Sequence, residues 1–160
     1  MRKNTFLALH LAGLVGLGGL VGCATPELPA HGNFTQSAPA GIHQTLADDA
    51  ARQLVVVYPP ASTCLDLQQA TPDAFGSLLV ESLRAKGYAL LEFKAGSKTA
   101  ASPGTDRAAG AGKPLRYILD QLDANLYRLT LRVGDQSLTR AYLATQSGTL
   151  HPAGVWLRKE

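Results

Sequence analysis

One cysteine near the N-terminus stands where the chemistry of lipid attachment requires it. Cys23 ends the run Leu20-Val21-Gly22-Cys23, in which aliphatic residues and a small residue precede the thiol. This order is typical of a bacterial lipobox, where the thiol takes a diacylglycerol, a peptidase cuts after Gly22, and the new amine is acylated. Two or three acyl chains hold a protein stably on a bilayer, whereas one binds only marginally. We therefore predict that Cys23 is lipidated.

The segment before the lipobox has the anatomy of a secretory signal. Arg2 and Lys3 form a positive n-region, and Phe6 to Val21 form an apolar h-region. The h-region is shorter than the roughly 20 residues of a membrane span, and its glycines disfavour a stable helix. We predict that residues 1–22 are removed. Ala24, rather than an aspartate, favours the outer membrane by analogy with enterobacterial sorting.

The remaining polar residues show no catalytic pattern. The histidines of the mature chain have no metal-ligand spacing and are His31, His43 and His151. The carboxylate pair Asp48-Asp49 is explained by helix capping, and the pair Asp120 and Asp123 by a solvated turn. No nucleophile motif and no phosphate-binding loop occur in the sequence. We expect a protein that is not an enzyme and that binds no cofactor or metal.

The second cysteine is left without a partner in the chain if Cys23 carries lipid. Cys64 lies in the alternating run Cys64-Leu65-Asp66-Leu67. We interpret it as a buried, inert thiol, and intermolecular pairing is the alternative.

The charge balance excludes nucleic acid as an expected partner. The chain carries 15 Lys and Arg against 12 Asp and Glu, and removing Arg2 and Lys3 leaves a net charge of +1. This gives no electrostatic footprint for nucleic acid. Arg128, Arg132 and Arg140 are candidates for one basic sheet face, although a solvated strand face is the ordinary interpretation.

Composition divides the mature chain into three parts. Residues 23–42 comprise the lipidated cysteine and a stretch rich in Pro and Gly, which we interpret as a flexible tether spanning roughly 25 Å. Residues 43–160 form a single domain. Within it, residues 94–113 are rich in Ala and Gly and poor in large apolar side chains, so we predict a disordered surface loop.

Two helices are predicted in the domain. The first begins at Thr45, where Thr45 and Asp48 fit a relaxed capping box, and ends before Pro59-Pro60. The second has its N-cap in Thr71-Pro72-Asp73 and ends at Gly87, which supplies a left-handed residue.

The other segments alternate with the period of strands. They are residues 63–69, 88–93, 115–122, 127–133, 137–145 and 149–157. Short turns join the last four, so we expect an antiparallel meander. The predicted fold class is α+β, with two helices packed on a mainly antiparallel sheet of about five or six strands.

Large aromatic residues with polar groups are expected at the core or its edge. Tyr58 and Trp156 are the two that we single out as candidate partner contacts, because exposed Trp and Tyr are favoured at interfaces.

Two runs of the domain carry a family resemblance. They are Gln53 to Ala61 (QLVVVYPPA) and Thr71 to Tyr88 (TPDAFG and LRAKGY), and the ending PAGVWLRKE accompanies them. Together with the lipobox, they resemble TrbH, a conjugal-transfer lipoprotein of the Trb mating-pair-formation system. The resemblance implies a component of a conjugative type IV secretion apparatus, which assembles or stabilises the envelope-spanning channel. It transfers only Cys23 as a functional position.

Two functions follow as hypotheses. The first is a lipid-anchored structural subunit that faces the periplasm and binds other mating-pair-formation subunits in the envelope. The alternative is a periplasm-facing carrier or chaperone for lipids or secretion-channel subunits, which needs an apolar pocket between the helices and the sheet.

Overall fold

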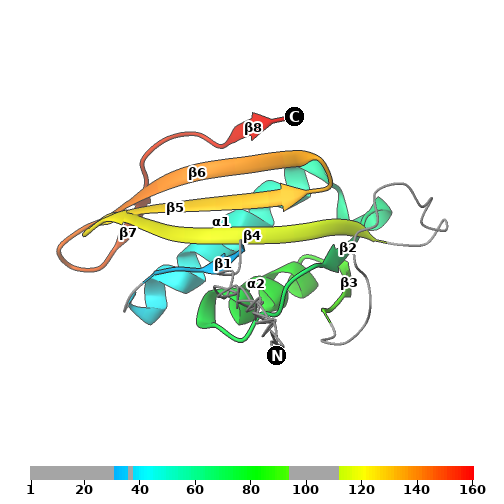
Figure 1. Ribbon diagram of the computed structural model, residues 1–160, viewed down its shortest axis with the longest axis horizontal. Helices are drawn as coiled ribbons and strands as arrows, with labels where there is room; N and C mark the ends of the chain where they lie inside the picture. Colours follow the sequence, from blue (N-terminus) through cyan, green and yellow to red (C-terminus); the bar gives the residue numbers. More distant parts are fainter. Residues whose placement is uncertain (1–30, 36–37, 94–111) are drawn as a thin grey trace, which may run out of the picture.

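The domain consists of an open sheet with two helices packed on one of its faces (Figure 1). The computed structural model describes residues 31–35, 38–93 and 112–160. The prediction of an α+β fold is confirmed. The described residues form eight strands rather than five or six, and the sheet is mixed.

Eleven elements follow one another in the described part of the chain. Their bounds are β1 (Gly32–Asn33), α1 (Ala40–Val57), a 3₁₀ turn (Pro60–Ser62), β2 (Cys64–Leu67), α2 (Ala74–Ala85), β3 (Ala89–Leu91), β4 (Lys113–Asp123), β5 (Leu126–Val133), β6 (Gln136–Ala144), β7 (Leu150–Pro152) and β8 (Leu157–Lys159).

Three long strands make the centre of the sheet. β4, β5 and β6 pair antiparallel in sequence order, as the predicted meander requires. Tyr127, Leu129, Leu131 and Val133 in β5 are buried, while Arg128 and Arg132 between them are exposed. The turn after β5 holds Gly134 at a φ of 60°, a conformation that glycine adopts without steric cost.

Short strands share the outer edges of the long ones, which explains the higher strand number. β1 and β2 both pair with β4, and β7 and β8 both pair with β6. The predicted continuous strand 149–157 is therefore wrong, because residues 153–156 leave the ladder between β7 and β8.

The parallel pairings come from crossovers that the sequence pattern did not show. β2 pairs in parallel with β3, and α2 forms the connection between them. Parallel strands need such a crossover, whereas antiparallel strands accept a tight turn.

Helix α1 starts five residues earlier than predicted. It begins at Ala40 after Pro39, which has no side chain to cap the helix. The predicted capping box is wrong, because Thr45 lies inside the helix and its hydroxyl donates to the Gly41 carbonyl at 3.0 Å.

The tether is correspondingly shorter than predicted. Ile42 is fully buried in the core, and β1 pairs with β4, so residues 32–35 and 38–42 belong to the domain. Residues 23–30 lie outside the described part of the chain. The predicted loop 94–113 also lies outside it up to residue 111, and Lys113 already belongs to β4.

Helix α2 is capped by Asp73 rather than Thr71. The Asp73 carboxylate accepts a hydrogen bond from the Gly76 amide at 3.0 Å. The predicted left-handed residue after the helix is confirmed, since Gly87 has a φ of 87°.

The core lies between the helices and the sheet. Its fully buried side chains come from α1, α2 and the inward faces of β2, β4, β5 and β6, and include Leu46, Leu54, Phe75, Leu79, Leu83, Leu65, Leu115, Leu119, Leu129, Leu138 and Tyr142. Neither of the two described helices, α1 and α2, covers the opposite face of the sheet (Figure 1).

Candidate interaction sites

Asp49 joins helix α1 to strand β6 and to the segment between β7 and β8. Its Oδ2 accepts hydrogen bonds from the Tyr142 hydroxyl at 2.7 Å, from Arg140 Nη1 at 2.9 Å and from Trp156 Nε1 at 3.2 Å. Its Oδ1 accepts a bond from Arg52 Nη2 at 3.0 Å. The side chain is only 13% exposed, so this carboxylate is a partly buried charge with full hydrogen bonding.

These contacts keep Asp49 ionised. Burial raises the pKa of the Asp49 carboxyl, but the hydrogen bonds from Tyr142 and Arg52 and the charge of Arg140 outweigh it, so the pKa is lowered. Burial, together with the bond to Asp49, raises the pKa of Tyr142. The paired and hydrogen-bonded Asp49 carboxylate holds its donors in place, because removing the carboxylate would leave these donors buried and unpaired.

Trp156, one of the predicted contact residues, points inward. Its ring packs edge-on against Tyr142, with centroids 6.4 Å apart and an interplanar angle of 80°. Its neighbours Val155 and Leu157 are 73% and 66% exposed. They border a groove of about 450 Å³ with Arg128 and Ala141. The sequence singled out the aromatic residue, whereas the two aliphatic residues beside it offer more accessible surface.

Tyr58, the other predicted contact residue, is half-buried beside the β5–β6 turn. Its hydroxyl donates to Gln136 Oε1 at 2.6 Å, and its carbonyl accepts the Tyr88 hydroxyl at 2.5 Å. The Lys113 ammonium lies 5.8 Å from its ring centroid. These contacts place Tyr58 at the junction of α1, β3 and β6, with one edge accessible.

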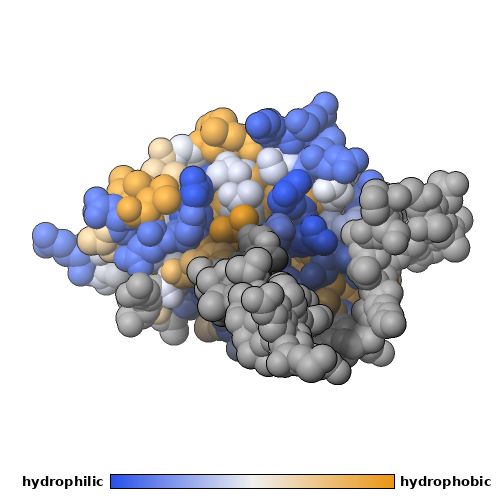
Figure 2. All heavy atoms as spheres, viewed as in Figure 1, coloured by the Kyte–Doolittle hydropathy of each residue, from blue (hydrophilic) through white to orange (hydrophobic). Residues whose placement is uncertain are grey.

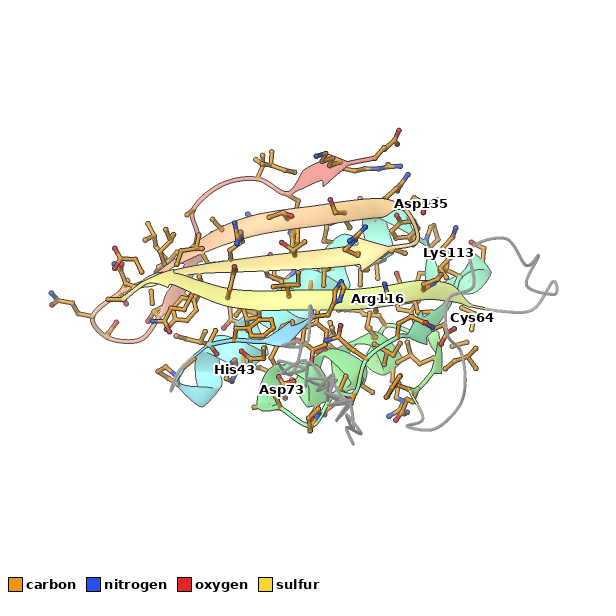
Figure 3. All side chains as sticks on the ribbon, viewed as in Figure 1. His43, Cys64, Asp73, Lys113, Arg116 and Asp135 are labelled. Atoms are coloured by element: carbon orange, nitrogen blue, oxygen red, sulfur yellow. The ribbon has the colours of Figure 1, made fainter. Side chains whose placement is uncertain are left out.

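A second cluster of polar side chains, centred on the Asp73 carboxylate, lies at the start of α2. Asp73 Oδ2 accepts the Tyr117 hydroxyl at 2.7 Å, and Oδ1 accepts Asn33 Nδ2 at 3.1 Å. The buried His43 lies beside it, with Asn33 Nδ2 3.5 Å from its Nε2, as Figure 3 shows for His43 and Asp73. This cluster links β1, α1, α2 and β4.

Several polar residues have roles other than those predicted. Asp48 and Asp49 do not cap α1, since both lie in its middle. Asp120 is not merely solvated but forms an ion pair with Arg128 across β4 and β5. Cys64 is half-buried rather than buried, and it is a free thiol.

The uncovered sheet face carries a row of cations, here called the basic row, composed of Arg116, Arg132 and Lys159. Arg116 pairs with Arg132, Arg132 with Ser137, and Ser137 with Lys159, so the row crosses four strands. Along each strand, the residues next to these cations have side chains that face the helices. Arg128 and Arg132 share this face as predicted, whereas Arg140 lies on the other face against Asp49.

The carboxylates of the uncovered face and of the C-terminus are already engaged. Asp120 pairs with Arg128, and Glu160 accepts bonds from Arg158 and Gln136. Within the part of the chain that the structure describes, the basic row forms no ion pair. Figure 2 shows hydrophilic side chains running from the C-terminal end of β8 across the sheet.

Across residues 31–35, 38–93 and 112–160, no group of three or more His, Cys, Asp or Glu is arranged to hold a metal ion. None of the helices in those ranges has the length and apolar character to cross a membrane. The predicted lipidation site, Cys23, lies outside the described residues.

Comparison with known proteins identifies the family to which this chain belongs. The described residues form a small α+β domain, and the family model for conjugal transfer protein TrbH matches residues 28–160. The chain therefore belongs to the TrbH family and is a component of conjugal transfer, with partners in the transfer apparatus. No curated protein and no solved structure gives a significant match.

Proposed function

We propose that this protein is a lipid-anchored structural component of the conjugative type IV secretion apparatus, held at the outer membrane and facing the periplasm. The observation that carries the anchor is the order of n-region, apolar run, Gly22 and Cys23 in a chain whose family acts in conjugal transfer. The family match begins at residue 28, so the anchor is supported by the sequence of this chain alone.

The domain acts by binding neighbouring subunits rather than by catalysis. Val155 and Leu157 are exposed aliphatic side chains on a segment that Trp156 fixes to Asp49. Arg140 Nε also donates to the Gly154 carbonyl at 2.8 Å, and the Ala153 amide donates to the Ala141 carbonyl at 2.9 Å. A preordered apolar surface loses little conformational entropy on binding, which favours a structural role.

The experiment that tests the anchor replaces the sulfur that would carry it. Cys23→Ser is expected to retain the signal peptide, to lack fatty acids by mass spectrometry, and to abolish plasmid transfer. Cys64→Ser is the matched control, since the Cys64 thiol makes one hydrogen bond among the described residues, to the Leu65 carbonyl at 3.9 Å, and we expect the substitution to leave processing and transfer unchanged. Normal transfer by Cys23→Ser, or a mature wild-type chain without fatty acids, would contradict the proposal.

A test of the docking surface uses the two exposed aliphatic residues. Val155→Ser with Leu157→Ser is expected to lower transfer while leaving the unfolding midpoint nearly unchanged, because neither side chain is buried. Val56→Ser is the matched control, since Val56 is an aliphatic side chain that is 77% exposed on α1. Equal transfer by the double variant and the control would remove this surface from the proposal.

A further inference from the structure

The three cations of the basic row form no ion pair with any residue that the structure describes. Adjacent strands lie about 4.8 Å apart, so the row extends roughly 14 Å from β4 to β8. Like charges directly opposite each other across strands, such as Arg116 and Arg132, destabilise a sheet. An anionic surface outside the chain would relieve this repulsion.

The chain enters the domain beside this row. His31 immediately precedes Gly32, which pairs with Ile118 in β4, two residues after Arg116. Burial, followed by the charges of Arg116 and Arg132, lowers the pKa of His31, which agrees with this proximity. Figure 3 shows Arg116 on β4 at the uncovered side of the sheet.

The distance from the lipid attachment point to this entry is short. Nine residue steps separate Cys23 from Gly32, which as a coil correspond to roughly 17 Å and fully extended to about 31 Å. The side of the domain that carries His31 therefore stays near the bilayer. A cation array held there meets phospholipid headgroups at high local concentration.

We propose that the basic row docks the domain on the anionic phospholipid headgroups of the membrane that holds it. The inference rests on lipidation of Cys23 as proposed above. A lipid chain combined with basic residues is a known way to strengthen and orient membrane attachment.

The test measures protection of Lys159 in the full processed protein, reconstituted into vesicles. The vesicles contain phosphatidylcholine alone or phosphatidylcholine with phosphatidylglycerol. An amine reagent modifies exposed lysines, and mass spectrometry compares Lys159 with Lys86, which lies at the end of α2. We expect Lys159 to be modified more slowly than Lys86 only in the anionic vesicles, and high salt to abolish the difference.

Substitutions locate the effect in the basic row. Arg132→Gln is expected to lower the ratio of docked to free domain about fivefold, and Arg116→Gln with Arg132→Gln about 25-fold. Arg84→Gln is the matched control, because Arg84 pairs with Glu92 on the helix side and its loss changes the net charge equally.

Each outcome has a definite meaning. A protein that lacks acyl chains and does not float with vesicles would overturn the anchor and the docking together. A protein that floats while Lys159 is equally reactive on both vesicles would overturn docking alone. Loss of transfer by the arginine variants without any Lys159 protection would assign the row to an acidic protein segment and would also overturn membrane docking.

Discussion

The indole nitrogen of Trp156 donates a hydrogen bond to the carboxylate of Asp49, 107 residues earlier in the chain. This contact fastens the segment between β7 and β8 to helix α1 across the edge of the sheet. Arg140 and Tyr142 of β6 donate to the same oxygen, so three donors from two separate parts of the chain converge on one atom. The outward orientation of Val155 and Leu157 depends on this convergence.

Replacing Asp49 should therefore destabilise the domain more than replacing an exposed acid. Asp49→Asn removes the charge opposite Arg140, whose side chain is 19% exposed, and we expect a loss of about 2–3 kcal/mol. Urea unfolding followed by far-ultraviolet circular dichroism measures it. Asp120→Asn is the control, because its pair with Arg128 is exposed and is worth about 0–1 kcal/mol. Equal losses in the two variants would show that Asp49 is an ordinary surface acid.

Gly76 should not tolerate a side chain, although it lies inside a helix. A Cβ there would overlap the Tyr117 hydroxyl and lie 2.8 Å from Thr71 Cβ. Tyr117 is fully buried and bonded to Asp73, so it cannot move away. We expect Gly76→Ala to lower the free energy of unfolding by about 1–3 kcal/mol.

Gly41→Ala is the matched control for Gly76. A Cβ at Gly41, also in a helix, meets nothing within 4 Å. We expect it to raise the free energy of unfolding by about 0.5–1 kcal/mol, because alanine restricts the unfolded chain. Urea unfolding of both variants should give changes of opposite sign, and two changes of the same sign would contradict the packing argument.

The elements with strong local signals were predictable from the sequence. The alternation of β5, the apolar stripe of α2 and the turn glycines Gly87 and Gly134 each depend on residues close in the chain. Local periodicity is a reliable indicator of such segments. The fold class followed from these elements.

The structural features that the sequence did not predict depend on contacts between residues that are distant in the chain. β1 has two residues and exists because β4 offers an edge, and the early start of α1 follows from the burial of Ile42. Neither has a local signal. The parallel pairing of β2 with β3 and β4 is likewise a property of tertiary arrangement.

The candidate site was only partly accessible to sequence reasoning. The residue type singles out Trp156. The sequence predicts a helix-capping role for its partner Asp49, because Asp49 follows Asp48. A weak signal was present, since Asp49 comes three residues after the buried Leu46, at the border of the apolar stripe. A single acid at such a border does not reveal which of the distant donors it meets.

Stability should fall as the pH drops from about 6.5 to about 5, in the range where histidine titrates. His43 is buried, and its Nδ1 has no hydrogen-bond partner among the described residues. Burial lowers the pKa of His43 below 6.5, and the charge of Asp73 only partly opposes this. The pKa of His31 is lowered as well, by burial and by Arg116 and Arg132.

The sign of the effect follows from proton binding. Because the folded-state pKa values are lower than those of the unfolded chain, the unfolded chain binds more protons below pH 6.5, and protonation favours unfolding. The stabilisation is therefore complete above that pH and is lost as the pH falls. The lowered pKa values of Asp48 and Asp49 act only near and below pH 3.8.

Urea midpoints measured across this range test the assignment to individual residues. The wild-type midpoint should decrease toward acid, and His43→Gln should show a smaller decrease, because glutamine keeps a polar side chain but does not titrate. His31→Gln, at the more accessible site, should remove a separate part of the dependence. A midpoint that does not change with pH, or that changes equally in all three proteins, would show that neither imidazole is held in its neutral form by the fold.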